Sequence, residues 1–114
     1  MSAGLYASVV WWDLAESEQT IESLRGFLRE QAVGVFARVP GLRLKFWISD
    51  PAAGRWGAVL LWESRAAAEA PLPGLAAGLI GYPPTHKFGF DVEATVEGRH
   101  HLPLLAGHGL ALEG

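Results

Sequence analysis

The sequence contains no cysteine, which excludes a disulfide framework, a thiolate metal site and a cysteine nucleophile. Charged residues are also few, at 18% of the chain, and the formal net charge of −3 comes without any basic run. The chain therefore lacks the electrostatic footprint of a nucleic-acid-binding protein. No apolar run approaches the ~20 residues that span a bilayer. We expect neither a nucleic-acid partner nor a membrane partner.

The amino-terminal residues Met1 to Gly4 lead directly into a strand-like segment. They show neither the basic stretch nor the apolar stretch of a secretory signal. We therefore expect a cytoplasmic protein.

What the chain does have is apolar surface: half of its 114 residues are hydrophobic. This length predicts one domain, which we place at residues 1–97. Residues 98–114 form a tail in which the apolar residues follow neither the period of a helix nor that of a strand. Because the tail is rich in leucine, we expect it to pack on its own domain or on a partner subunit.

The most informative stretch runs from Leu42 to Glu63 and predicts two strands joined by a turn. Pro51 suits the first central position of that turn, and Gly54 tolerates a positive φ. If Asp50 faces Arg55, the cross-strand pairs on one face of the hairpin are Trp47 with Ala58, Lys45 with Leu60 and Arg43 with Trp62. The pairs on the other face are then Phe46 with Val59 and Leu44 with Leu61.

This register gives the hairpin two different faces. One is apolar and consists of Leu42, Leu44, Phe46, Ile48, Val59 and Leu61. The other places Arg43, Lys45 and Trp47 beside Leu60 and Trp62. Because solvated faces are usually polar, we expect a second copy of the chain, or a ligand, to cover the face with lysine and tryptophan.

The remaining segments complete a simple order. Residues 5–14 predict a central strand, and residues 16–39 predict a helix with Ser17 as N-cap and close contacts at Gly26 and Gly34. That helix has an apolar stripe at Ile21, Leu24, Leu28, Ala32, Val35 or Phe36, and Val39. Residues 64–80 predict a second helix, broken by Pro71 and Pro73. Residues 86–96 alternate like an edge strand with one buried face.

The order β-α-β-β-α-β predicts a ferredoxin-like α+β sandwich with a four-stranded antiparallel sheet. A sheet face that presents tryptophan and leucine needs a cover. Two subunits that press these faces together would form a dimeric α/β barrel.

The string Pro40-Gly41-Leu42-x-x-Lys45-x-Trp47, an acidic turn at Asp50, and Gly57 to Glu63 before an alanine-rich helix resemble the YdhR-type monooxygenases. These belong to the dimeric α/β-barrel superfamily, together with antibiotic-biosynthesis monooxygenases, muconolactone isomerase and haem-degrading enzymes. The resemblance covers about residues 5–96. The chain departs from the family pattern in the prolines of its second helix and in its tail.

The resemblance implies a homodimer with an apolar pocket for a small aromatic or polyketide-like substrate. It implies a monooxygenase without a bound cofactor, in which the deprotonated substrate itself reduces O₂. Such a site needs a hydrophobic cage, a base and a donor to the developing oxyanion. Two alternatives stay open: a cofactor-free cyclase or isomerase of the muconolactone-isomerase kind, and a non-catalytic small-ligand-binding dimer.

Three residues are candidates for the chemistry. Lys45 can act as a base with a lowered pKa or hold an anion, although a lysine paired with an acid at an interface would look the same. His86 enters the last strand and can exchange a proton near neutral pH, although a lone histidine is more often structural. Tyr82, in the preceding loop, can donate to an oxyanion or simply pack.

The substrate-binding candidates are aromatic. Of the five tryptophans, we expect Trp11, Trp47 and Trp62, with Phe46, to line the pocket, and Trp56 to be peripheral. Core packing is the ordinary alternative. We predict no metal, because adjacent His100 and His101 would point apart on an extended chain and no carboxylate completes a set with His108. No nucleotide fingerprint occurs, and we predict no cofactor, although one histidine would suffice for haem.

Overall fold

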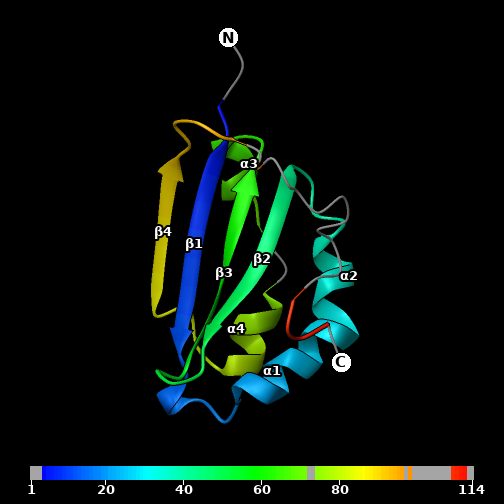
Figure 1. Ribbon diagram of the computed structural model, residues 1–114, viewed down its shortest axis with the longest axis vertical. Coiled ribbons are helices and arrows are strands. Elements are labelled where there is room, and N and C mark those ends of the chain that lie inside the picture. Colours follow the sequence, from blue (N-terminus) through cyan, green and yellow to red (C-terminus); the bar gives the residue numbers. More distant parts are fainter. Residues whose placement is uncertain (1–3, 72–73, 97, 99–108, 113–114) are drawn as a thin grey trace.

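The structure is a computed structural model and describes residues 4–71, 74–96, 98 and 109–112. Its four strands are β1 (Tyr6–Asp13), β2 (Leu42–Asp50), β3 (Arg55–Trp62) and β4 (His86–Asp91). All neighbouring strands are antiparallel, in the order β2-β3-β1-β4 (Figure 1). The fold is the expected ferredoxin-like α+β sandwich, and the central position of β1 is confirmed.

The hairpin register is confirmed over most of its length. Asp50 lies opposite Arg55, Lys45 opposite Leu60, and Phe46 opposite Val59. The pairing of Arg43 with Trp62 is wrong, because an irregularity between residues 42 and 44 places Leu42 opposite Trp62. A bulge of this kind shifts the pairing by one residue. Leu42 therefore packs with Trp62 on the face that the helices cover, whereas the prediction placed it with Leu44 on the other face; the faces from Leu44 onward are unchanged.

The first crossover begins with a short 3₁₀ turn, η1 (Leu14–Glu16). A longer helical stretch follows, made of α1 (Ile21–Phe27), the π-helical turn η2 (Leu28–Ala32) and α2 (Val33–Phe36). The predicted start of this helix is wrong. Thr20 is the N-cap, and it exchanges hydrogen bonds with Ser23 in a capping box. Ser17 instead donates its hydroxyl to the carbonyl of Ile80, 2.8 Å away.

The apolar stripe of this helix is confirmed at Leu24, Leu28, Ala32 and Phe36, which are all buried. The predicted close contacts at its glycines are wrong. A Cβ added at Gly34 would have no atom within 4 Å. A Cβ added at Gly26 would have only the end of the flexible Arg29 side chain within that distance.

The second crossover is broken, as predicted, into α3 (Arg65–Glu69) and α4 (Leu75–Ile80). Ser64 caps α3 by accepting a hydrogen bond from the backbone of Ala67. The last strand lies at an edge of the sheet, also as predicted, but it ends at Asp91 instead of residue 96. Its expected buried face is absent from the single subunit, since Phe88 and Phe90 are both exposed.

The helices cover one face of the sheet. In Figure 1 the strands lie in front of α3 and α4, and α1 and α2 lie beside β2. The covered face carries the buried side chains of Trp12, Trp56, Ala58, Leu60 and Trp62. Trp56 is therefore part of the core, and the expectation that it is peripheral was wrong.

This arrangement overturns the prediction that a second copy covers the face with Lys45 and Trp47, because the helices of the same subunit cover it; the alternative, a ligand beside these two residues, stays a prediction. Trp62 is 0% exposed within one subunit, and Trp47 packs against the buried residues of both clusters. Arg43 does not share this cover and is exposed. The open face is the opposite one, and by the strand register it carries Ala7, Val9, Trp11, Leu44, Phe46, Ile48, Gly57, Val59, Leu61, His86, Phe88 and Phe90.

Within the described ranges, no helix has the length and apolar character needed to cross a membrane.

Candidate functional site

A cavity of about 890 Å³ follows the edge strand β2, between that strand and the helices. Its volume falls in the usual range for small-molecule sites. The described residues that line it are Arg25, Leu28, Val33, Phe36, Ala37, Leu42 to Ser49, Trp56 and Gly109 to Leu112. The strand supplies one wall, the helix from Ile21 to Phe36 supplies another, and the carboxy-terminal segment supplies a third.

Lys45 points its amine toward the aromatic part of this cavity. Its Nζ lies 3.1 Å from the ring centroid of Phe36 and 4.6 Å from that of Trp47. The two rings meet edge to face, with centroids 5.9 Å apart, which is a favourable arrangement for aromatic pairs. The alternation of β2 brings Lys45 and Trp47 to the same face, and the apolar stripe of the helix brings Phe36 against them.

The environment of Lys45 makes its charged form costly. Burial lowers the pKa of the Lys45 amine from 10.5 to about 7. The aromatic faces act in the opposite direction, since a ring face attracts an ammonium ion. Desolvation is the larger effect, so a substantial fraction of the amine is neutral near pH 7.

The other charged groups that line the cavity are also cationic. Arg25 and Arg43 belong to its lining, and no carboxylate side chain does so among the described residues. Arg25 forms an ion pair with Glu22, in which Nη1 of the arginine lies 3.8 Å from Oε2 of the glutamate. No carboxylate of the described chain lies within ion-pair distance of Lys45. The alternative of a lysine paired with an acid thus finds no support within one subunit.

The carboxy-terminal segment 109–112 closes one side of the cavity. Ala111 is buried in the same core cluster as Leu24 and Leu28, and its carbonyl accepts a hydrogen bond of 2.9 Å from Nη1 of Arg29. In Figure 1 the red segment lies against α1 and α2. The remaining tail residues 99–108, 113 and 114 lie outside the described residues, and they include His100, His101 and His108.

The structure brings only some of the predicted pocket residues together. Trp47 lines the cavity beside Lys45. Phe46 borders it along the strand, but its side chain belongs to the open face, and it is 48% exposed. Trp62 is a core residue, and its indole donates a 2.9 Å hydrogen bond to the hydroxyl of Ser8.

The three predicted catalytic residues do not converge. His86 lies on the open face, where its ring is 4.7 Å from that of Trp11, on the other side of the sheet from Lys45. Tyr82 donates its hydroxyl to the carbonyl of Asp13, and its own carbonyl accepts a 2.8 Å hydrogen bond from Trp12. These hydrogen bonds connect the loop before β4 to the end of β1. They give Tyr82 a structural role and occupy the hydroxyl that was expected to serve an oxyanion.

The sequence reasoning missed Phe36, Arg25 and the carboxy-terminal wall as cavity residues. Phe36 lies on the apolar stripe of the helix, a signal that indicates only burial. Arg25 lies outside the predicted apolar stripe, so its position in the sequence did not indicate a cavity. The leucines of the tail indicated packing, but they did not indicate which surface they would meet.

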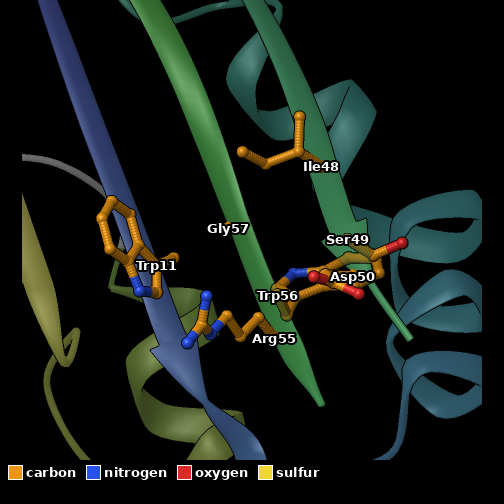
Figure 2. A pocket seen from close by; sticks show the side chains of 7 residues that line it. All are labelled: Trp11, Ile48, Ser49, Asp50, Arg55, Trp56 and Gly57. Atoms are coloured by element: carbon orange, nitrogen blue, oxygen red, sulfur yellow. The ribbon is translucent and has the colours of Figure 1, made fainter. Parts of the chain in front are cut away.

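A smaller hollow of about 230 Å³ lies near the turn between β2 and β3 (Figure 2). Trp11, Ile48 and Arg55 border it, and Gly57 leaves room between them. A Cβ at Gly57 would lie 2.2 Å from the carbonyl oxygen of Val10 and 2.7 Å from Cβ of Trp11, so the close strand pairing requires this glycine. The ion pair between Arg55 and Asp13, at 3.3 Å, is nearby and half exposed. The larger cavity is the better candidate site, because it holds the one strongly perturbed basic group of the described chain.

No three histidine, aspartate or glutamate side chains of the described chain gather closely enough to hold a metal ion.

Comparison with known proteins identifies the fold. No protein-family model matches the chain, and no curated protein matches it. Among solved structures, it is similar to a mutant of SnoaB, a cofactor-independent oxygenase from Streptomyces nogalater. The TM-score is 0.59 and the sequence identity is 16%, over 84% of this chain and 100% of that one. It is also similar to a proposed antibiotic biosynthesis monooxygenase from Bordetella bronchiseptica. Here the TM-score is 0.58 and the identity is 16%, over 80% of this chain and 99% of that one.

Proposed function

We propose that this protein is a cofactor-independent monooxygenase that oxidises a small aromatic or polyketide-like molecule in the cavity beside β2. The observation that carries the proposal is the amine of Lys45, held against Phe36 and Trp47 in an apolar cavity. The fold shared with SnoaB supports the reaction class by analogy, which is a weaker warrant than the site itself.

In the proposed reaction, the neutral amine of Lys45 removes a proton from an activated C–H or O–H group of the substrate. The resulting anion passes electrons to O₂ and forms a bond to oxygen. Loss of water from that peroxide completes the conversion of a CH₂ group and O₂ into a carbonyl group and H₂O. The substrate is the only reductant, so the electrons balance without a cofactor.

The cavity supplies the remaining requirements of this chemistry. Phe36 and Trp47 offer faces on which a planar substrate can stack. Arg25 and Arg43 place positive charge along the lining, where it favours an anionic intermediate. Ala111 and its neighbours limit access from solvent on one side.

We further propose that a second copy of the chain covers the open face of the sheet. The exposed side chains of this face include Leu44, Phe46, Ile48, Phe88 and Phe90. A contiguous apolar patch of this kind is unusual on a monomer. A face-to-face dimer would bury it and leave the Lys45 cavity on the other side of each sheet.

The test is oxygen consumption by the purified protein with an anthrone as substrate. Lys45→Met should lower the rate by about 100-fold or more, since a general base contributes about that factor. Lys87→Met removes the only other lysine, which is exposed on β4, and should leave the rate unchanged. The wild-type rate should rise with pH through about 7, where the amine loses its proton.

Two outcomes would contradict the oxygenase, and a third would contradict the role of Lys45 as its base. Product formed equally well without O₂ would indicate the cyclase or isomerase. Substrate bound but unchanged would indicate the carrier. Full activity in Lys45→Arg, whose side chain stays charged, would show that position 45 supplies positive charge and is not the base.

A further inference from the structure

A primary amine that is partly neutral near pH 7 and lies in an apolar cavity is a nucleophile as well as a base. Lys45 has the required surroundings: its Nζ rests against Phe36 and Trp47 and borders open cavity space. By contrast Lys87, the other lysine of the chain, lies on an exposed edge strand. The fold therefore gives two amines of the same chemistry very different environments.

We propose that the side-chain amine of Lys45 captures carbonyl compounds as an imine, with 1,3-dicarbonyl segments as the preferred class of ligand. The inference uses the same cavity and amine as the proposed oxygenase, but it requires no O₂. It therefore stands or falls independently of the oxygenase reaction.

The electrostatics of the cavity support a neutral, reactive amine. The Nζ atom of Lys45 lies against the rings of Phe36 and Trp47, and Arg25 and Arg43 line the same cavity. Loss of hydration in the cavity disfavours the charged amine, while the rings favour it. The described lining holds no acidic side chain that could stabilise the charged amine, and the carboxylate of Glu22 pairs with Arg25 at 3.8 Å. Burial lowers the pKa of Lys45 to about 7.

The reaction balances without any further reactant. The nitrogen of Lys45 attacks the carbonyl carbon, and the resulting carbinolamine loses water to give a C=N bond. With a 1,3-dicarbonyl ligand, a proton then moves from the central carbon to nitrogen. This gives a conjugated enaminone, which is more stable than a simple imine. The apolar cavity favours the condensation because it excludes water from the product.

The shape of the site favours a flat, extended ligand over a compact one. The aromatic wall of Phe36 and Trp47 stands directly beside the nucleophile, and the cavity continues along β2 toward residues 109–112. A dicarbonyl segment attached to an aromatic group would place its carbonyl at Nζ and its ring on this wall. A simple aldehyde would gain the covalent bond without the stacking.

The experiment is anaerobic incubation of the full chain with acetylacetone at pH 7. Intact-mass measurement follows the adduct, near-ultraviolet absorbance follows the enaminone, and peptide mapping locates it. We expect a mass increase of one diketone less one water, with Lys45 modified at least tenfold faster than Lys87 in the same molecule. Lys45→Met should abolish the fast adduct, and Lys87→Met should keep it. Unfolding the wild type in urea should remove the preference for Lys45.

The proposal is overturned if both lysines react equally in the folded protein. It is also overturned if no adduct forms, or if the fast adduct persists in Lys45→Met. Because the comparison of the two lysines is made within the wild type, it holds even if a variant folds poorly. Oxygen uptake is measured separately, in air with an anthrone. Its absence would count against the oxygenase and leave the capture reaction standing, whereas oxygen uptake by a protein that forms no adduct would do the reverse.

Discussion

At the scale of single residues, Lys45 dominates the chemistry of this molecule. Its ammonium form loses hydration inside the cavity, and the rings of Phe36 and Trp47 restore only part of that loss. The same environment that makes the amine reactive therefore makes the fold less stable when the amine is charged. Reactivity and stability at this position can be measured separately.

The pKa of Lys45 predicts a pH dependence of stability. The amine has its ordinary pKa in the unfolded chain and a pKa of about 7 in the folded one, so the unfolded state binds more protons between pH 7 and 10.5. Stability must then rise with pH across this window. From pH 6 to 9 the contribution is up to about 2.5 kcal/mol, at about 1.4 kcal/mol for each pKa unit.

Urea unfolding at each pH tests this prediction. Lys45→Met should be more stable than the wild type at pH 6 and should lose most of the rise, whereas Lys87→Met should keep it. A flat wild-type profile would show that Lys45 is charged in the folded protein and that the rings or water compensate for its burial.

At the scale of elements, the carboxy-terminal segment 109–112 is the least expected part of the site. It is far in sequence from the helix that it contacts, and two features hold it: the buried Ala111 and the hydrogen bond from Arg29 to the Ala111 carbonyl. A bond from a charged donor contributes about 1.5–3 kcal/mol. Loss of this hydrogen bond should therefore weaken the attachment of the segment to the helix.

We predict that Arg29→Gln weakens this wall and lowers the affinity of the cavity for an apolar fluorescent probe by at least threefold. Quenching of tryptophan fluorescence by the same probe provides a second readout, because Trp47 and Trp56 both line the cavity. Arg38→Gln is the matched control, because Arg38 is exposed beyond the end of α2 and does not line the cavity. Equal affinities in all three proteins would show that the segment does not bound the binding site.

At the scale of the whole molecule, the sheet is covered on one face and open on the other. The open face is almost entirely apolar in its middle, with the charged residues Asp13, Asp50 and Arg55 at one end. A second subunit is the simplest cover for such a face. The prediction concerns association and not the fold of the subunit.

Phe46→Glu should convert a dimer into a monomer at micromolar concentration, since it would bury an unpaired charge in the centre of the interface. Light scattering after size-exclusion chromatography measures this directly. Val35→Glu is the control: it adds the same charge at a helix residue of comparable exposure, 39% against 48%, and should leave the dimer intact. A wild-type protein that is monomeric at all concentrations would refute the proposed association.

The sequence by itself determined the order of the elements and most of the hairpin register. Both depend on local physics: a Pro-Gly stop, a turn with Pro51 and Gly54, and the two-residue alternation of strands. It also identified Lys45 and Trp47 as neighbours on one strand face, because residues two apart in a strand must share a face.

The tertiary structure alone decided which face of the hairpin meets the helices. Both faces carry large apolar side chains, so alternation separates them without showing which is inside, and the face with Lys45 proved to be the covered one. Only the packed chain could place Phe36 against Lys45, add Ala111 to the lining of the same cavity, or join Tyr82 to Asp13 by a hydrogen bond. These contacts join different elements, so they depend on how whole elements fit together.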